Sequence, residues 1–282
     1  MGILDAIVEK TRLRVEERRS RTPERELRAR LKDAPPTRSF SEALTRGFGV
    51  IAEHKRRSPS GGPSNPKNVH ECLGAYAETP WIRAVSVLTD EDYFDGRLDD
   101  LRVARETVGK PVLRKDFIVD EYQVVEARVT GADAILLMGS VLFRAPARMQ
   151  ALYDAAKDVG LDVLVELGMS ERPIEELVAL VPSETRIWGI NARQFATRGE
   201  DTGGDRDAQA THDLPTDVSV HRDYRKLVPP GKIAVAESGI HTAAELGAAR
   251  AAGYHAALVG TAFLKGPASV REVVAELGRA FA

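Results

Sequence analysis

The stretch Pro-Val-Leu-Arg-Lys-Asp-Phe at residues 111–117 decides the fold prediction, because a short apolar run ends there abruptly in charged residues and an aromatic ring. Side chains of a buried strand alternate between its two faces, so Lys115 shares one face with Leu113 and Phe117. Lys115 is therefore expected at the open end of the core that Leu113 helps to fill. Arg114 points to the opposite side, where we expect it to form an outer salt bridge.

Three further apolar runs end in charged residues in the same way. They are Val-Ile-Ala-Glu-His-Lys at 50–55, Val-Leu-Val-Glu-Leu at 163–167 and Ile-Ala-Val-Ala-Glu-Ser-Gly at 233–239. A fold that gathers the ends of separate strands around one pit would bring these charges together.

Eight short apolar runs alternate with amphipathic stretches from residue 48 to the end of the chain. The runs are expected to be strands and cover 50–52, 82–88, 111–113, 134–138, 163–165, 187–190, 233–236 and 256–259. The amphipathic stretches are expected to be helices and cover 68–77, 98–108, 122–130, 147–159, 173–180, 224–228, 243–252 and 269–281. Strands that are apolar on both faces are typical of a parallel sheet covered by helices, so the alternation predicts a (β/α)8 TIM barrel.

An open, doubly wound parallel sheet is the alternative architecture. It would leave exposed strand edges and would normally carry a glycine-rich phosphate turn after its first strand. This chain instead has Ser-Pro-Ser-Gly-Gly at 58–62.

The residues before the first strand predict a helical extension. An apolar stripe indicates a helix over 3–32, with Thr22-Pro23 as the cap and first-turn proline of a second segment, and two prolines at 35–36 end it. Its interleaved charges are expected to form a solvated face rather than a nucleic-acid arm. We expect residues 1–282 to form one barrel domain, of which 1–47 is this extension.

Composition excludes several classes of partner. The hydrophobic fraction is 43%, the charged fraction 29% and the formal net charge −2, a balance that calls for neither nucleic acid nor an anionic membrane. Without a signal-like start or a run of roughly 18 apolar residues, we expect a cytoplasmic protein. Cys72, the one cysteine, is expected to be a small buried residue, and the six histidines lack metal-binding spacings, so no metal site is expected.

Catalytic groups of a TIM barrel lie at the carboxyl ends of its strands, which share one rim. Any one charged residue there could be a structural salt-bridge partner. Burying several of them together costs several kcal/mol per ion, which favours a functional site. The inward-facing candidates are Glu53, Lys55, Lys115, Glu166, Asn191 and Glu237.

Small residues follow the last two expected strands, at Ser238-Gly239 and at Gly260-Thr261. In many barrels the backbone amides of these two loops, with the N-terminus of a short helix, bind a phosphate. A plain tight turn is the alternative. Two other stretches are expected to be loops: residues 58–65 as a lid over the site, and 197–211 as a partly disordered surface loop with almost no apolar side chain.

Ordered motifs occupy most of the expected strand ends. They are Ile51-Ala52-Glu53 with Lys55 and Ser58-Pro59-Ser60, Ser86-Val87-Leu88-Thr89-Asp90 with Tyr93-Phe94, Leu113-Arg114-Lys115-Asp116-Phe117-Ile118, Gly131-Ala132-Asp133-Ala134-Ile135-Leu136-Leu137, Val165-Glu166, Gly189-Ile190-Asn191 with Arg193, and Ala236-Glu237-Ser238-Gly239-Ile240. In these motifs and in its N-terminal extension the chain resembles the indole-3-glycerol phosphate synthase family, a group of barrel enzymes of tryptophan biosynthesis.

The resemblance implies a carboxy-lyase that closes the ring of 1-(2-carboxyphenylamino)-1-deoxyribulose 5-phosphate without a cofactor, with loss of carbon dioxide and water. By matching motif, Lys115 resembles the general acid that protonates the substrate carbonyl. Lys55 resembles the cation that pairs with the anionic groups and gives a proton in the dehydration. Glu53 and Glu166 resemble the carboxylates that accept protons and stabilise positive charge on the ring and its nitrogen.

The same resemblance implies the substrate contacts. Asn191 and Glu237 resemble positions that orient the hydroxyls and the carboxylate, with Arg193 nearby. The remaining implied contacts are Ser58 after the first strand, Phe94, Phe117 and Leu136 around the anthranilate ring, and Ser238, Gly239, Gly260 and Thr261 around the phosphate. The segment between Asn191 and Glu237 is longer than is usual in the family.

Alternative functions remain open at this point. A sugar-phosphate isomerase would share the phosphate site but would want a different acid and base pair. A non-catalytic or specialised-pathway relative would bind a similar anthranilate sugar phosphate without needing every acid and base. For an enzyme of this kind we expect an anionic sugar-phosphate substrate and a monomer or weak homodimer.

Overall fold

The computed structural model describes residues 3–58, 62–63, 69–168, 172–193, 216–264 and 268–282. The predicted lid at 58–65 lies mostly outside these ranges, and the predicted surface loop at 197–211 lies wholly outside them.

Eight parallel strands form a closed barrel in the order β1-β10-β9-β8-β7-β6-β5-β4, which confirms the TIM barrel and excludes the open sheet. The strands are β1 Gly49–His54, β4 Ile82–Leu88, β5 Val112–Lys115, β6 Ala134–Met138, β7 Asp162–Gly168, β8 Ile187–Asn191, β9 Ile233–Glu237 and β10 Ala256–Val259.

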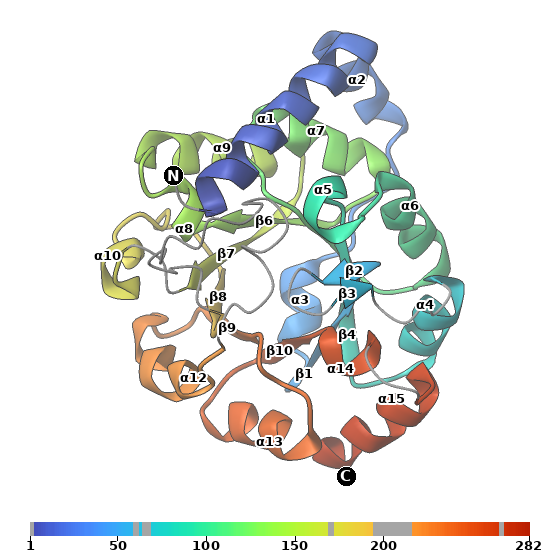
Figure 1. Ribbon diagram of the computed structural model, residues 1–282, viewed down its shortest axis with the longest axis vertical. Coiled ribbons are helices and arrows are strands. Elements are labelled where there is room, and N and C mark those ends of the chain that lie inside the picture. Colours follow the sequence, from blue (N-terminus) through green and yellow to red (C-terminus); the bar gives the residue numbers. More distant parts are fainter. Residues whose placement is uncertain (1–2, 59–61, 64–68, 169–171, 194–215, 265–267) are drawn as a thin grey trace, which may run out of the picture.

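Helices surround the barrel on the outside, as Figure 1 shows. Those that follow successive strands are α4 Val69–Glu78, α6 Leu98–Thr107, α7 Glu121–Thr130, α9 Pro146–Asp158, α10 Ile174–Val178, α12 Ser219–Tyr224, α13 Ala243–Ala251 and α15 Val270–Gly278. Shorter elements of the loops are β2 Arg57–Ser58, β3 Gly62–Pro63, α5 Glu91–Phe94, α8 Gly139–Leu142, α14 Thr261–Leu264, and the 3-10 turns η2 Arg225–Leu227 and η3 Arg279–Phe281. Within the described ranges, no helix is both long and apolar enough to cross a membrane.

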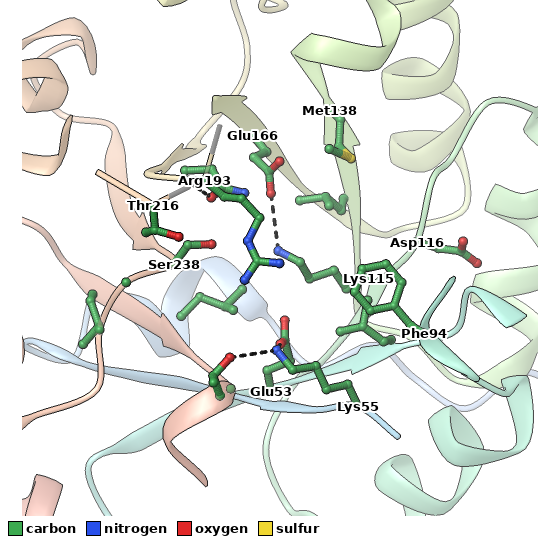
Figure 2. A pocket seen from close by; sticks show the side chains of 18 of the residues that line it. Glu53, Lys55, Phe94, Lys115, Asp116, Met138, Glu166, Arg193, Thr216 and Ser238 are labelled. Atoms are coloured by element: carbon green, nitrogen blue, oxygen red, sulfur yellow. Dashed lines mark hydrogen bonds and ion pairs between the residues drawn. The ribbon is translucent and has the colours of Figure 1, made fainter. Parts of the chain in front are cut away.

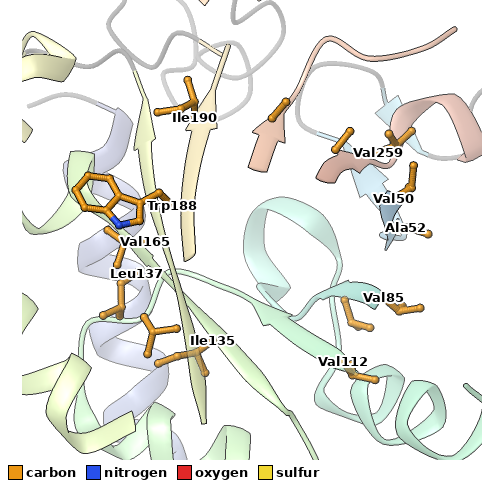
Figure 3. Packing of buried hydrophobic residues seen from close by; sticks show 14 of the residues in the cluster. Val50, Ala52, Val85, Val112, Ile135, Leu137, Val165, Trp188, Ile190 and Val259 are labelled. Atoms are coloured by element: carbon orange, nitrogen blue, oxygen red, sulfur yellow. The ribbon is translucent and has the colours of Figure 1, made fainter. Parts of the chain in front are cut away.

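Two apolar layers follow from the alternation of side chains along the strands. Inward-facing residues such as Ile51, Leu113 and Leu164 fill the barrel. Outward-facing residues such as Val112 and Trp188 pack between the strands and the helices (Figure 3). The predicted period of two is therefore confirmed, and Cys72 of α4 is fully buried, as expected.

The N-terminal extension consists of α1 Ile3–Arg21, α2 Glu24–Ala29, the 3-10 turn η1 Arg30–Asp33 and α3 Phe40–Leu44. Phe40 and Leu44 are fully buried in the same cluster as the barrel interior, so α3, which precedes β1, closes the amino-terminal end of the barrel. On α1, Arg18 pairs with Glu126 of α7 at 3.2 Å. The charged face of α1 is thus partly bound to the barrel rather than wholly solvated.

Three local predictions were wrong. Pro23 itself is the N-cap of α2 and no side chain caps this helix, so Thr22 does not cap it. The helix expected at 224–228 is η2, and α12 begins earlier, where Asp217 accepts a hydrogen bond from Ser219 N at 3.0 Å. The stretch expected at 173–180 is helical only over α10.

Candidate active site

A cavity of about 220 Å³ opens at the carboxyl ends of the barrel strands. It brings together thirteen of the fifteen predicted site residues: Glu53, Lys55, Phe94, Lys115, Phe117, Leu136, Glu166, Asn191, Arg193, Ser238, Gly239, Gly260 and Thr261. Figure 2 shows how the labelled side chains, among them Glu53, Lys115 and Glu166, converge from different strands. The remaining two are Ser58, which lies in β2 where it pairs with Gly62, and Glu237, which lies beneath the cavity.

Lys115 is the cation at the centre of the cavity. Its Nζ lies 2.8 Å from Glu237 Oε2 and 3.3 Å from Glu166 Oε2. Burial by itself lowers the pKa of Lys115, but the charges of Glu237, Glu166 and Glu53 outweigh burial and raise it above the ordinary value of a lysine. Lys115 is therefore protonated at neutral pH and has a proton to give.

A second ion pair lies on the β1 side of the cavity. Lys55 Nζ lies 2.8 Å from Glu53 Oε1 and donates to Thr261 Oγ1 at 3.2 Å. Burial lowers the pKa of Lys55. Burial would raise the pKa of Glu53, but the charges of Lys55 and Lys115 outweigh it and lower this pKa, so Glu53 is a carboxylate at neutral pH.

Glu237 is fully buried below Lys115. Burial raises the pKa of Glu237 to about 8, against the opposing charge of Lys115 and with help from the neighbouring Glu166. Neither Glu166 Oε1 nor Glu237 Oε1 accepts a hydrogen bond from a donor group of the described residues. Since its pKa is raised, Glu237 can hold a proton and donate it in a hydrogen bond to Glu166.

Two glycines make room for these carboxylates. A Cβ at Gly189 of β8 would lie 1.9 Å from Glu237 Oε1, and a Cβ at Gly260 would lie 2.3 Å from Glu53 Oε1. Such distances are far below any allowed contact between non-bonded atoms. Gly260, predicted as a phosphate contact, therefore has a second role as a space for Glu53, and Gly189 has the same role for Glu237.

An apolar wall faces the ion pairs. The rings of Phe94 and Phe117 lie 6.5 Å apart between centroids, tilted by 36°. Leu136 and Met138 continue this wall along β6. Phe94 is held there by α5, whose N-cap is Asp90.

The opposite side of the cavity is a turn of unusual backbone conformation. Ser238 has φ of 68° and Gly239 has φ of 75°, so two successive residues are left-handed. Asn191 Oδ1 accepts a hydrogen bond from Arg193 N at 2.9 Å, and the Arg193 side chain reaches into the cavity (Figure 2). Backbone amides of left-handed turns can form concave sites for anions.

Behind β5, Arg114 forms the predicted outer salt bridge. Its guanidinium is fully buried and lies 2.9 Å from Asp116 Oδ2 and 2.9 Å from Glu126 Oε2 of α7. These contacts fix the strand end that carries Lys115. Among the described residues, no group of three or more His, Cys, Asp or Glu side chains is arranged to hold a metal ion.

Several cavity residues were not predicted from the sequence. Asp116 and His241 lie within or directly after predicted motifs, and their polar character was the available signal. Thr216 reaches the cavity through an isolated antiparallel bridge with Arg193, which no local pattern indicates. The others that line the cavity are Leu88, Met138, Ile240 and Leu258.

Substituting Asp90 with asparagine should make the protein less sensitive to rising pH. Burial, and next the charge of Asp116, raises the pKa of Asp90 to about 7, whereas an unfolded aspartate titrates at about 3.9. Between these two pKa values the folded state thus binds one proton more than the unfolded state. The stabilisation that this proton gives the folded state is complete below about pH 4 and is lost as the pH rises through 7. The substituted asparagine stays neutral, and its Oδ1 can accept from Tyr93 N as Asp90 does at 2.7 Å.

Urea unfolding at pH 5 and pH 8 measures this difference. D90N should lose less stability than the unsubstituted protein over that interval. Asp99→Asn is the control, because it removes the same charge from a side chain that is 79% exposed. Equal pH dependence in D90N and the unsubstituted protein would contradict the role of Asp90.

Comparisons with known proteins cover nearly the whole chain. The family model for indole-3-glycerol phosphate synthase matches residues 4–277. The chain is 38% identical over 269 residues to the indole-3-glycerol phosphate synthase of Rhodopirellula baltica, covering 95% of each chain. It is 39% identical over 266 residues to indole-3-glycerol phosphate synthase 2 of Streptomyces coelicolor, covering 94% of each.

Solved structures share the fold at much lower identity. N-(5'-phosphoribosyl)anthranilate isomerase from Pyrococcus furiosus has a TM-score of 0.54 and 14% identity, over 83% of this chain and 98% of that one. Orotidine 5'-phosphate decarboxylase from Pyrococcus horikoshii OT3 has a TM-score of 0.53 and 13% identity, over 76% of this chain and 92% of that one. These two show the barrel alone, whereas the family model and the relatives above cover nearly the whole chain, and the protein therefore belongs to the indole-3-glycerol phosphate synthase family.

Proposed function

We propose that the protein converts 1-(2-carboxyphenylamino)-1-deoxyribulose 5-phosphate to indole-3-glycerol phosphate, the product that its relatives' names give. The observation that carries the proposal is the single cavity in which Lys115 and Lys55, each paired with a carboxylate, face an apolar wall. A substrate with an aromatic ring, a carbonyl group and two anionic groups matches these three features.

In the first step, a ring carbon attacks the substrate carbonyl carbon and a carbon–carbon bond forms. The carbonyl electrons move to its oxygen, which takes the proton of Lys115 Nζ. A positioned general acid of this kind typically contributes about 10²–10⁴-fold to the rate. Glu237, whose Oε2 lies 2.8 Å from Lys115 Nζ, would then return a proton to the lysine.

The next two steps expel carbon dioxide and water. Breaking the bond to the ring carboxyl group returns its electrons to the ring, which discharges the positive charge that Glu166 stabilises in the intermediate. Lys55 then protonates the departing hydroxyl group, and a carboxylate takes a proton from the neighbouring carbon. Glu53 suits this last role because its pKa is lowered and it is a carboxylate at neutral pH.

The remaining cavity residues would bind the substrate. Phe94, Phe117 and Leu136 would hold the anthranilate ring. Arg193 and Lys55 would pair with its carboxylate while Asn191 orients the hydroxyl groups. The phosphate would be bound by Ser238, Gly239, Gly260 and Thr261, with Ser58 as a further contact from β2. Glu237, which lies below the cavity, would act on the substrate through Lys115.

Purified protein should turn over this substrate without any added cofactor, because no step needs a metal ion or an electron carrier. The product contains an indole ring, so its fluorescence follows the reaction directly. If the protein bound a substrate analogue but formed no product from the substrate over hours, this result would contradict the proposal and would favour a non-catalytic relative.

We further propose that the extension and barrel form a single domain over residues 1–282, in a cytoplasmic protein that is a monomer or weak homodimer. Ion pairs between α1 and the barrel support the single domain. Arg19 pairs with Asp120 at 2.6 Å and Arg14 with Asp92 at 3.2 Å, and both link α1 to the barrel.

A further inference from the structure

We propose that His221 is a positioning residue of the active site, which holds the left-handed turn at Ser238-Gly239 in the conformation that binds the substrate phosphate. The inference rests on the proposed function for the identity of that anion. His221 belongs to α12, which lies beside β8 and β9 on the outside of the barrel (Figure 1). It does not line the cavity, so its effect must pass through the backbone of β9.

The contact is a hydrogen bond to the last residue of β9. His221 Nε2 lies 3.0 Å from the carbonyl oxygen of Glu237. A carbonyl oxygen can only accept, so Nε2 carries the proton and donates it. The same carbonyl oxygen accepts from Ala192 N at 2.9 Å, so two donors from different elements hold the peptide unit between Glu237 and Ser238.

This peptide unit directly precedes the strained part of the turn. Ser238 has φ of 68°, in the left-handed region that residues with a Cβ adopt at an energetic cost. Such a conformation persists when surrounding contacts over-determine it. The bond from His221 is one of these contacts, since it fixes the plane of the peptide on which Ser238 turns.

The residues just before α12 supply the remaining contacts. A Cβ at Gly239 would lie 2.6 Å from Val218 Cγ1 and 2.8 Å from Thr216 Cγ2, so these side chains pack directly on the glycine. Asp217 N donates to the carbonyl oxygen of Ala192 at 3.0 Å. The segment 216–221 therefore packs against the turn that lines the cavity.

His221 is itself held in one orientation. The residue is 7% exposed, and its ring meets the ring of Tyr254 edge-on with centroids 5.9 Å apart. The Tyr254 hydroxyl donates to the His221 carbonyl oxygen at 2.7 Å. A side chain fixed in this way can transmit position to the turn, which a mobile surface histidine could not.

Replacing His221 with phenylalanine tests the proposal, because the ring is kept and the donor is lost. One net hydrogen bond corresponds to roughly a fivefold change in an equilibrium constant. We therefore expect H221F to raise KM and the Kd for inorganic phosphate about fivefold, with kcat within about twofold of the unsubstituted protein. H221Q, whose side-chain amide can donate to the same carbonyl oxygen, should recover most of the loss.

A double-mutant cycle with Ser238→Gly shows whether the effect passes through the turn. Glycine adopts positive φ without the cost of a Cβ, so on the S238G background the H221F effect should shrink to less than about twofold. Val220→Ala is the matched control. It opens a cavity at a buried neighbour on the same helix and should lower stability without changing KM or phosphate affinity.

Phosphate affinity, measured by calorimetry, separates this inference from the proposed function. If the protein binds phosphate but gives no indole product, the proposed function fails while the phosphate titrations still test His221. Unchanged phosphate affinity in H221F, or an equal effect of H221F with and without S238G, would overturn the proposal. The proposal would also be overturned if V220A lost as much phosphate affinity as H221F, or if the unsubstituted protein did not bind phosphate.

Discussion

Replacing Lys115 with alanine should lower kcat at least about hundredfold, the loss that typically follows removal of a general acid. Lys115 Nζ stands between Glu237 Oε2 and Glu166 Oε2 at 2.8 and 3.3 Å, and it is the group proposed to protonate the carbonyl oxygen. No other described side chain replaces it, because Lys55 is already paired with Glu53 across the cavity. The measurement is kcat and KM from indole fluorescence.

The control for this substitution is Lys110→Ala. Lys110 precedes β5, and its Nζ donates to the carbonyl oxygens of Tyr76 and Thr79, away from the cavity. Both variants remove one lysine charge, but only Lys115 lines the cavity. K110A should therefore affect stability and leave kcat close to normal. Normal turnover by K115A, or an equal loss in K110A, would contradict the role given to Lys115.

The sequence predicted which side chains meet, because alternation along a strand determines the face on which each residue lies. Lys115 and Glu166 needed only this rule and closure of the barrel to converge. The height of a side chain along the barrel axis depends instead on the stagger between strands, which the sequence of a single strand does not encode. Glu237 lies beside Asn191 of β8 and Leu258 of β10 in the register, yet its carboxyl group reaches back into the space above Gly189. Its position below the cavity could therefore not be predicted.

The segment around α12 shows a second limit. Its helix starts through a local contact of Asp217 with Ser219, which an apolar pattern does not reveal. The packing of Thr216 and Val218 on Gly239 joins residues more than twenty positions apart in the chain. A polar stretch without apolar periodicity gives no signal for such contacts, so the approach of Thr216 to the cavity was missed.

Substituting Gly189 with alanine should impair both stability and turnover, although residue 189 has no side chain to take part in chemistry. The new Cβ would lie 1.9 Å from Glu237 Oε1 and 3.3 Å from Leu164 Cδ1, so the carboxyl group must leave its place below Lys115. Overpacking of this kind costs about 1–3 kcal/mol of unfolding free energy. Displacing a support of the general acid should lower kcat by about tenfold or more, since its geometry and pKa both depend on that contact. Urea unfolding and kcat measure the two effects.

The double substitution G189A/E237D distinguishes a steric cause from a general defect of β8. Aspartate is one methylene shorter than glutamate, so it should relieve the clash and restore much of the stability, while its carboxyl group no longer reaches Lys115 and turnover stays low. Gly247→Ala in α13 is the control, because its Cβ would meet no atom within 4 Å and alanine favours a helix. It should be neutral or stabilising and fully active. If G189A matched G247A in both stability and kcat, the result would contradict the role of Gly189 in leaving space for the Glu237 carboxyl group beside Lys115.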